Sequence, residues 1–64
     1  MNYFKEYERL KETKQLIPIG SIWTDYFWKV QIIEVTLERV YFMFYGATSS
    51  YNKRTFLENF TRVK

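Results

Sequence analysis

The side chains that most often carry enzyme chemistry are missing from this sequence of 64 residues. It contains no His and no Cys, which removes the commonest general bases, nucleophiles and zinc ligands. Its two glycines, Gly20 and Gly46, are isolated and form no phosphate-binding loop. Glu8 and Glu12 lie one helical turn apart, a spacing typical of a solvated helix face. We therefore expect a protein that is not an enzyme, with no catalytic residue, no metal site and no cofactor.

Aromatic side chains are abundant, at 22% of the residues. Between residues 27 and 45, alternation places two sets of side chains on opposite faces of a β-hairpin. We expect the buried face to hold Trp28, Val30, Ile32, Val35, Val40 and Phe42. The opposite face then holds the candidate partner-binding set: Phe27, Lys29, Gln31, Tyr41, Met43 and Tyr45. Tyr and Met are favoured at protein interfaces, and an exposed patch of large side chains indicates an interaction surface.

The sequence leaves the occupant of this second face open between three alternatives. The N-terminal helix can cover it with apolar side chains, namely Tyr3, Phe4, Tyr7 and Leu10. A second copy of the chain can cover it in a homodimer, or a partner protein or nucleic acid can bind it. The hairpin register is also open, because the turn at Thr36–Arg39 has no Gly or Asn. A slip of one residue would exchange the two faces.

The net charge of +3 comes from ten Lys and Arg against seven Asp and Glu. The excess lies in residues 50–64, where the basic side chains outnumber a single acidic one, Glu58. These basic residues, with a Tyr that can stack on a base, form a candidate nucleic-acid set: Tyr51, Lys53, Arg54, Arg62 and Lys64. A solvated, solubilising edge explains the same composition equally well.

A helix and several short strands must position these side chains. The spacing of apolar residues predicts an amphipathic helix over Asn2–Gln15, with Asn2 as its N-cap and Pro18 and Gly20 just beyond its end. After Gly20 the period falls to two. This predicts strands at 21–24, 27–35, 40–45 and 51–54, with turns at 25–26 and 36–39 and a polar turn at 46–50.

Two local signals complete this outline. The alternation slips after Ile32, which predicts a β-bulge around Ile33–Glu34. The pattern of Thr55–Glu58 is that of a capping box, which predicts a helical turn carrying Phe56, Leu57 and Phe60. Residues 61–63 can then close the sheet against the first strand. We expect Trp23, in that first strand, to lie in the core.

Residues 19–63 resemble small phage and prophage domains that have an SH3-like or KOW-like barrel. The resemblance lies in Ile19–Asp25, in Val30–Ile32 followed by Val35, in Val40–Phe42 and in the tail Phe56–Val63. Those domains usually have a Gly near Tyr26–Phe27, which this chain lacks, and the N-terminal helix is an addition to them. The resemblance implies an accessory protein of a phage or mobile element, of the kind that inhibits a host enzyme or regulates transcription.

The expected fold is mainly β (α+β), in a single domain spanning 1–64. An N-terminal helix (1–16) precedes a strongly bent, five-stranded antiparallel SH3-like barrel (19–64). The leading function is a non-enzymatic interaction protein that binds and blocks a host protein. The alternative is a small nucleic-acid-binding regulatory module that uses the basic C-terminal segment. The lack of Cys, of a secretory signal and of any apolar run near 20 residues favours the host cytosol and no membrane partner.

Overall fold

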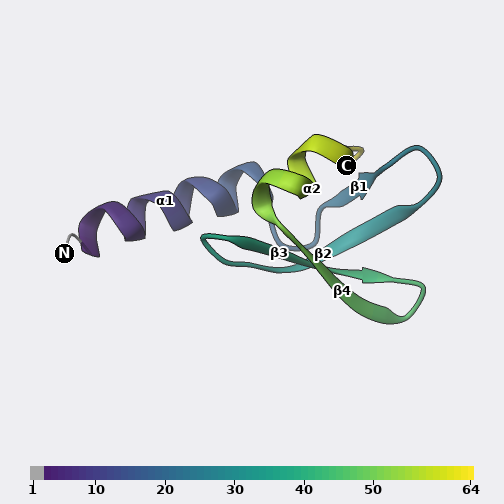
Figure 1. The fold of residues 1–64 in the computed structure, drawn as a ribbon, viewed down its shortest axis with the longest axis horizontal. Helices are drawn as coiled ribbons and strands as arrows, with labels where there is room; N and C mark the ends of the chain where they lie inside the picture. The colour runs from purple at the N-terminus through teal and green to yellow at the C-terminus, as the bar shows by residue number, and fades with distance from the viewer. Residues whose placement is uncertain (1–2) are drawn as a thin grey trace.

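The computed structural model describes residues 3–64, with side chains from Lys5 onward. The predicted N-terminal helix is confirmed as α1 (Tyr3–Leu16), while the predicted Asn2 cap lies outside the described residues. The amide of Ile17 still donates to the carbonyl of Thr13 (2.8 Å), and Pro18 cannot continue the helix. Figure 1 shows α1, in purple, projecting away from the sheet.

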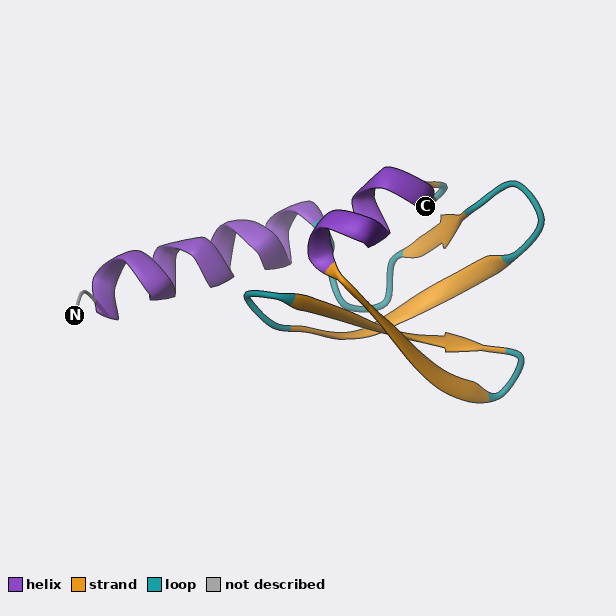
Figure 2. Cartoon of the chain, viewed as in Figure 1, coloured by secondary structure: helices purple, strands orange, loops and turns teal. Residues whose placement is uncertain are grey.

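Five antiparallel strands follow α1, and their order in the sheet is β4-β3-β2-β1-β5. Their bounds are β1 (Ile22–Thr24), β2 (Lys29–Val35), β3 (Arg39–Phe44), β4 (Ala47–Asn52) and β5 (Thr61–Arg62). The predicted mainly β fold with one N-terminal helix and five antiparallel strands is confirmed. Within the described residues β4 and β5 are the two edges, so the sheet is open (Figure 2).

A β-bulge in β2 lies where the alternation of the sequence slips. Ile32 pairs with Phe42, but the next pair along the two strands is Glu34 with Tyr41, which leaves Ile33 as the extra residue. The bulge returns Val35 to the face that Ile32 occupies, and both side chains are buried. The predicted bulge is confirmed.

The turn between β2 and β3 is closed by a threonine. The amide of Thr36 donates to the carbonyl of Arg39 (2.9 Å), and the Thr36 hydroxyl accepts from the amide of Arg39 (3.0 Å). A hydroxyl of this kind stabilises a turn without a glycine. It therefore holds the register in which Val35 and Val40 are paired and buried.

The predicted polar turn at 46–50 is wrong, because β4 occupies most of that segment. Tyr45 and Gly46 have φ values of 50° and 79°, and they form a two-residue turn between the paired residues Phe44 and Ala47. Positive φ at both central residues is the requirement of a type I′ hairpin turn. The chain therefore returns to pairing at Ala47, and β4 ends at Asn52.

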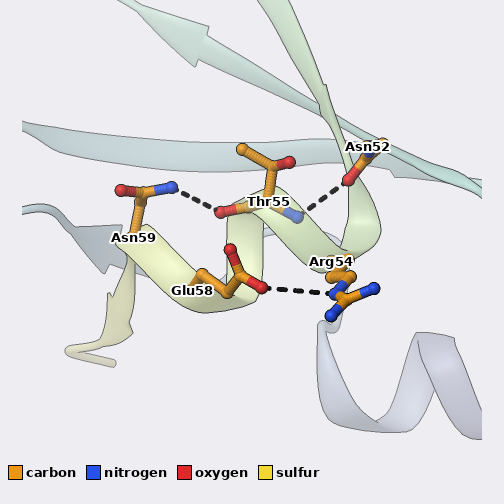
Figure 3. Close-up of polar contacts among 5 residues, drawn as sticks. All are labelled: Asn52, Arg54, Thr55, Glu58 and Asn59. Carbon is orange, nitrogen blue, oxygen red and sulfur yellow. Dashed lines mark hydrogen bonds and ion pairs between the residues drawn. The ribbon is translucent and has the colours of Figure 1, made fainter.

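The second helix, α2 (Lys53–Asn59), begins earlier than the capping-box pattern predicts. Its N-cap is Asn52, whose side chain accepts from the amide of Thr55 at 2.8 Å (Figure 3). Thr55 is thus inside the helix. The side chain of Glu58 forms an ion pair with Arg54 (3.3 Å) instead of reaching back to the amide of an N-cap residue. Asn ranks with Ser and Asp as the best N-cap residues, so the helix starts at the Asn that ends β4.

The core lies between α2 and one face of the sheet, here called the inner face. Its buried side chains are Ile17, Trp23, Val30, Ile32, Val35, Val40, Phe42, Phe56 and Phe60. The rings of Phe56 and Phe60 stack with their centroids 4.6 Å apart. Trp23 is buried, as predicted, and its Nε1 donates to Ser21 Oγ (2.9 Å). The prediction that Trp28 lies in this core is wrong, since it belongs to the loop before β2 and is 44% exposed.

Candidate functional site

Two loops meet at the end of the sheet that lies away from α1 (Figure 1). One is the β1–β2 loop, residues 25–28, and the other is the Tyr45–Gly46 turn. The ring of Trp28 lies 5.1 Å from that of Tyr45 and 5.5 Å from that of Phe44, both in edge-to-face geometry. This arrangement is favourable for aromatic pairs, so the rings join the two loops. We call the residues of this cluster the aromatic tip: Tyr26, Phe27, Trp28, Phe44 and Tyr45.

Asp25 builds the β1–β2 loop. Its Oδ1 accepts from the amides of Trp28 (3.0 Å) and Phe27 (3.3 Å), and its own amide donates to the carbonyl of Trp28 (3.3 Å). An Asp that accepts from the following amides forms an Asx turn, which reverses the chain locally. The loop therefore includes residues 27 and 28, and β2 starts at Lys29 instead of Phe27 as predicted.

The aromatic tip is exposed to an extent that the fold does not require. Tyr26 is 97% exposed, Phe27 83% and Tyr45 76%. Tyr26 also has a φ of 94°, a backbone conformation that residues other than Gly adopt at a cost of about 1–2 kcal/mol. Residues of this kind often lie at a functional surface, because an exposed side chain adds little packing energy to offset the cost of a strained backbone.

A shallow depression of about 580 Å³ adjoins the aromatic tip on the side of α2. Its lining includes Tyr26 of the tip and Leu57 and Phe60 of the segment around α2. The remaining lining residues are Thr24, Asp25, Glu58, Asn59 and Thr61.

The predicted partner-binding set is divided between two places. Lys29, Gln31 and Met43 are exposed on the face of the sheet opposite the core, here called the outer face, with Gln31 paired to Met43 and Tyr41 half-buried beside them. Phe27 is in the β1–β2 loop and Tyr45 is in the β3–β4 turn, so neither belongs to the outer face. The structure brings those two residues to the aromatic tip instead.

The alternative in which the N-terminal helix covers the outer face is wrong for the described residues. Lys29, Gln31 and Met43 remain exposed, as does Tyr7 on α1. Leu10 is half-buried beside a hollow that it shares with residues 35–39 of the β2–β3 turn. The side chains of the predicted covering residues Tyr3 and Phe4 lie outside the described part of the chain.

The residues of the candidate nucleic-acid set come from β4, α2, β5 and residue 64. The Nζ of Lys53 donates to Thr13 Oγ1 of α1 (3.1 Å), and Arg54 is paired with Glu58 on α2. Arg62 is on edge strand β5, and Lys64 follows it, bonded through its backbone to Ile22. Tyr51 lies on β4 with its ring 5.6 Å from Phe42 and 5.9 Å from Phe60, so part of its face is already covered.

Within residues 3–64, no group of three or more acidic side chains is arranged to hold a metal ion. Neither described helix has the length and apolarity needed to cross a bilayer.

Sequence reasoning missed Tyr26, Trp28 and Phe44 as members of the candidate site. Alternation assigned Trp28 to the core, and residues 25–26 were expected to form a turn without a role. The signal that could have found them is the run Asp25-Tyr26-Phe27-Trp28, because an Asp that starts an Asx turn draws the next residues into a loop. Three aromatic residues in a loop of that kind cannot all be buried.

Comparisons of this chain with models of protein families, with curated proteins and with solved structures give no match.

Proposed function

We propose that this protein is a non-enzymatic binding module and that it recognises a partner protein through the aromatic tip. The observation that supports this most directly is the exposure of Tyr26, Phe27 and Tyr45 at two adjoining loop ends. Large aromatic side chains held in place by their own loops contribute much contact area at little entropic cost. Such residues are typical anchors of protein interfaces.

The charges around the tip favour a protein over a nucleic acid. The carboxylate of Asp25 is engaged by two amides of its own loop, and Lys29 is the basic residue that follows the loop. Nucleic-acid affinity depends mainly on several Lys and Arg contacts to phosphates. In the C-terminal segment, Lys53 and Arg54 already contact Thr13 of α1 and Glu58 of α2.

The proposal extends to the fold and to the setting in which the protein acts. The chain order, the bulge in β2 and the placement of α2 between β4 and β5 support an SH3-like barrel that is opened between its edge strands. The resemblance of residues 19–63 to small phage domains supports a host protein in the bacterial cytosol as the partner. Binding would then block that protein by occupying its surface.

The test is capture of partners from a bacterial host lysate, with nuclease present and at about 150 mM salt, near physiological ionic strength. The wild-type chain is compared with a tip variant, Tyr26→Ala with Phe27→Ala, and with an outer-face variant, Gln31→Ala with Met43→Ala. We expect the wild type and the outer-face variant to retain the same protein and the tip variant to lose it. In titration with the purified partner, the tip variant should bind at least about 30-fold more weakly, as for loss of central anchors.

Three outcomes would contradict the proposal. Equal capture by the tip variant would place binding elsewhere. Loss of capture in the outer-face variant alone would assign binding to the outer face of the sheet. A partner that disappears on nuclease treatment, with affinity falling steeply with salt, would favour the nucleic-acid alternative.

A further inference from the structure

The depression beside the aromatic tip carries negative charge. Besides Tyr26, the ionisable side chains in its lining are Asp25 and Glu58, and both are acidic. Among the described residues that line it there is no Lys or Arg, although the whole chain has a net charge of +3. A hollow whose charged groups share one sign attracts a ligand of the opposite sign.

Each of the two carboxylates keeps an oxygen for a further hydrogen bond. The loop amides that bind Asp25 both donate to its Oδ1, which leaves Oδ2 available. Glu58 uses Oε1 in its ion pair with Arg54, and its other oxygen points away from that guanidinium (Figure 3). Both side chains of this pair are exposed, and an exposed pair contributes little to stability. The two carboxylates can therefore accept from a donor outside the chain.

An aromatic ring and apolar side chains complete the depression. Tyr26 is 97% exposed, so the face of its ring can receive a cation. Leu57, which is half-buried, and Phe60, which is buried, add apolar surface on which the methylene stem of a long side chain can lie. The volume of about 580 Å³ is within the range of ligand sites.

We propose that this depression receives an arginine side chain of the partner protein, an inference that rests on the proposed function of the aromatic tip. The guanidinium donates to the carboxylates of Asp25 and Glu58, and its flat face lies against the ring of Tyr26. Arginine fits this lining better than lysine, because its planar fork of N–H groups can bind carboxylates and stack on an aromatic ring at the same time. Arginine is also enriched among the residues that dominate protein interfaces.

The test uses N-acetyl-argininamide as the probe and N-acetyl-citrullinamide as a neutral compound of nearly the same shape. Nuclear magnetic resonance titration of the full chain, labelled with ¹⁵N, follows the amides of Tyr26, Leu57 and Asn59. We expect the arginine compound to shift these amides with a Kd of about 10 mM, as for a ligand of few atoms. The citrulline compound should bind at least about fivefold more weakly, because it lacks the charge that strengthens the hydrogen bonds.

Two double variants locate the binding. Asp25→Asn with Glu58→Gln removes both charges of the depression, while an amide oxygen at residue 25 can still accept from the loop amides. The matched control, Glu34→Gln with Glu38→Gln, removes two charges near the β2–β3 turn, at the opposite end of the sheet (Figure 1). We expect the first variant to lose the preference for the arginine compound and the control to retain it.

Equal binding of the two compounds to the wild type overturns the proposal. Loss of the preference in the control does so as well, since it would indicate the overall charge of the chain instead of a site. The titration needs no partner protein, so it decides the arginine site even where capture from a lysate fails. With a captured partner, a tip variant that loses binding beside an Asp25→Asn, Glu58→Gln variant that stays within about twofold of wild type would keep the proposed function and overturn the arginine site.

Discussion

At Tyr26 the backbone adopts a φ of 94°, which glycine adopts without strain and tyrosine does not. Replacing Tyr26 with Gly should raise the free energy of unfolding by about 0.5–1 kcal/mol. The relief of about 1–2 kcal/mol of strain in the left-handed region exceeds the cost of about 0.5–1 kcal/mol that glycine adds by freeing the unfolded chain. The same variant should weaken partner binding, since it deletes an anchor of the aromatic tip. Urea denaturation of the variant measures the first effect.

The matched control for this prediction is Phe27→Gly. Phe27 is the next residue in the same loop, is similarly exposed and has no positive φ. Glycine there should lower stability by about 0.5–1 kcal/mol, because it adds freedom to the unfolded chain. If both variants were destabilised to the same extent, the backbone of Tyr26 would not be strained.

The individual residues of the tip were predictable only in part. Phe27 and Tyr45 were predicted to be exposed, and the structure confirms this, but Trp28 was assigned to the core. Apolar residues occur at every second position from Trp28 through Val30 to Ile32, so this pattern does not show where the strand begins. That boundary is set by the two amide hydrogen bonds of Asp25, which depend on a side-chain conformation rather than on hydrophobicity.

Among the elements, α2 offers the sharpest comparison between the sequence pattern and the structure. Replacing Asn52 with Ala should lower the free energy of unfolding by about 1 kcal/mol, because the amide of Thr55 loses its acceptor. Replacing Thr55 with Ala should cost less, since its described hydrogen bonds involve its backbone (Figure 3). Thermal denaturation of the two variants measures both changes, and a larger loss for Thr55→Ala would restore the capping-box assignment.

The strands were predictable where side chains alternate and not where the backbone alone decides. The bulge at Ile33 and the turn at Thr36–Arg39 could be placed because they interrupt or connect apolar runs. Residues 47–50 are small and mostly polar, so their composition predicts a loop. They form a strand because the positive φ values of Tyr45 and Gly46 return the chain to β3, where pairing satisfies their backbone groups.

For the molecule as a whole, stability depends on the contact between α2 and the inner face. Phe56 is fully buried and its ring lies 5.1 Å from Trp23 and 5.8 Å from Phe42. Replacing Phe56 with Ala should cost about 3–5 kcal/mol, a large part of the total stability of a chain this short. We expect loss of the cooperative thermal transition at neutral pH, measured by circular dichroism. Phe27→Ala, an exposed aromatic control, should change stability by less than about 0.5 kcal/mol, and an equal loss there would contradict this account of the core.

The projection of α1 also governs how the single chain tumbles in solution. The molecule measures 40 × 19 × 18 Å, so it is about twice as long as it is wide. N–H bonds in a helix lie nearly parallel to its axis, and α1 runs along the long direction of the molecule (Figure 1). Those bonds reorient mainly through end-over-end rotation, the slowest motion of an elongated body, whereas bonds that cross the long axis also reorient through faster spinning about it. In nuclear magnetic resonance, the amides of α1 should therefore show a longer apparent rotational correlation time than the amides of the sheet.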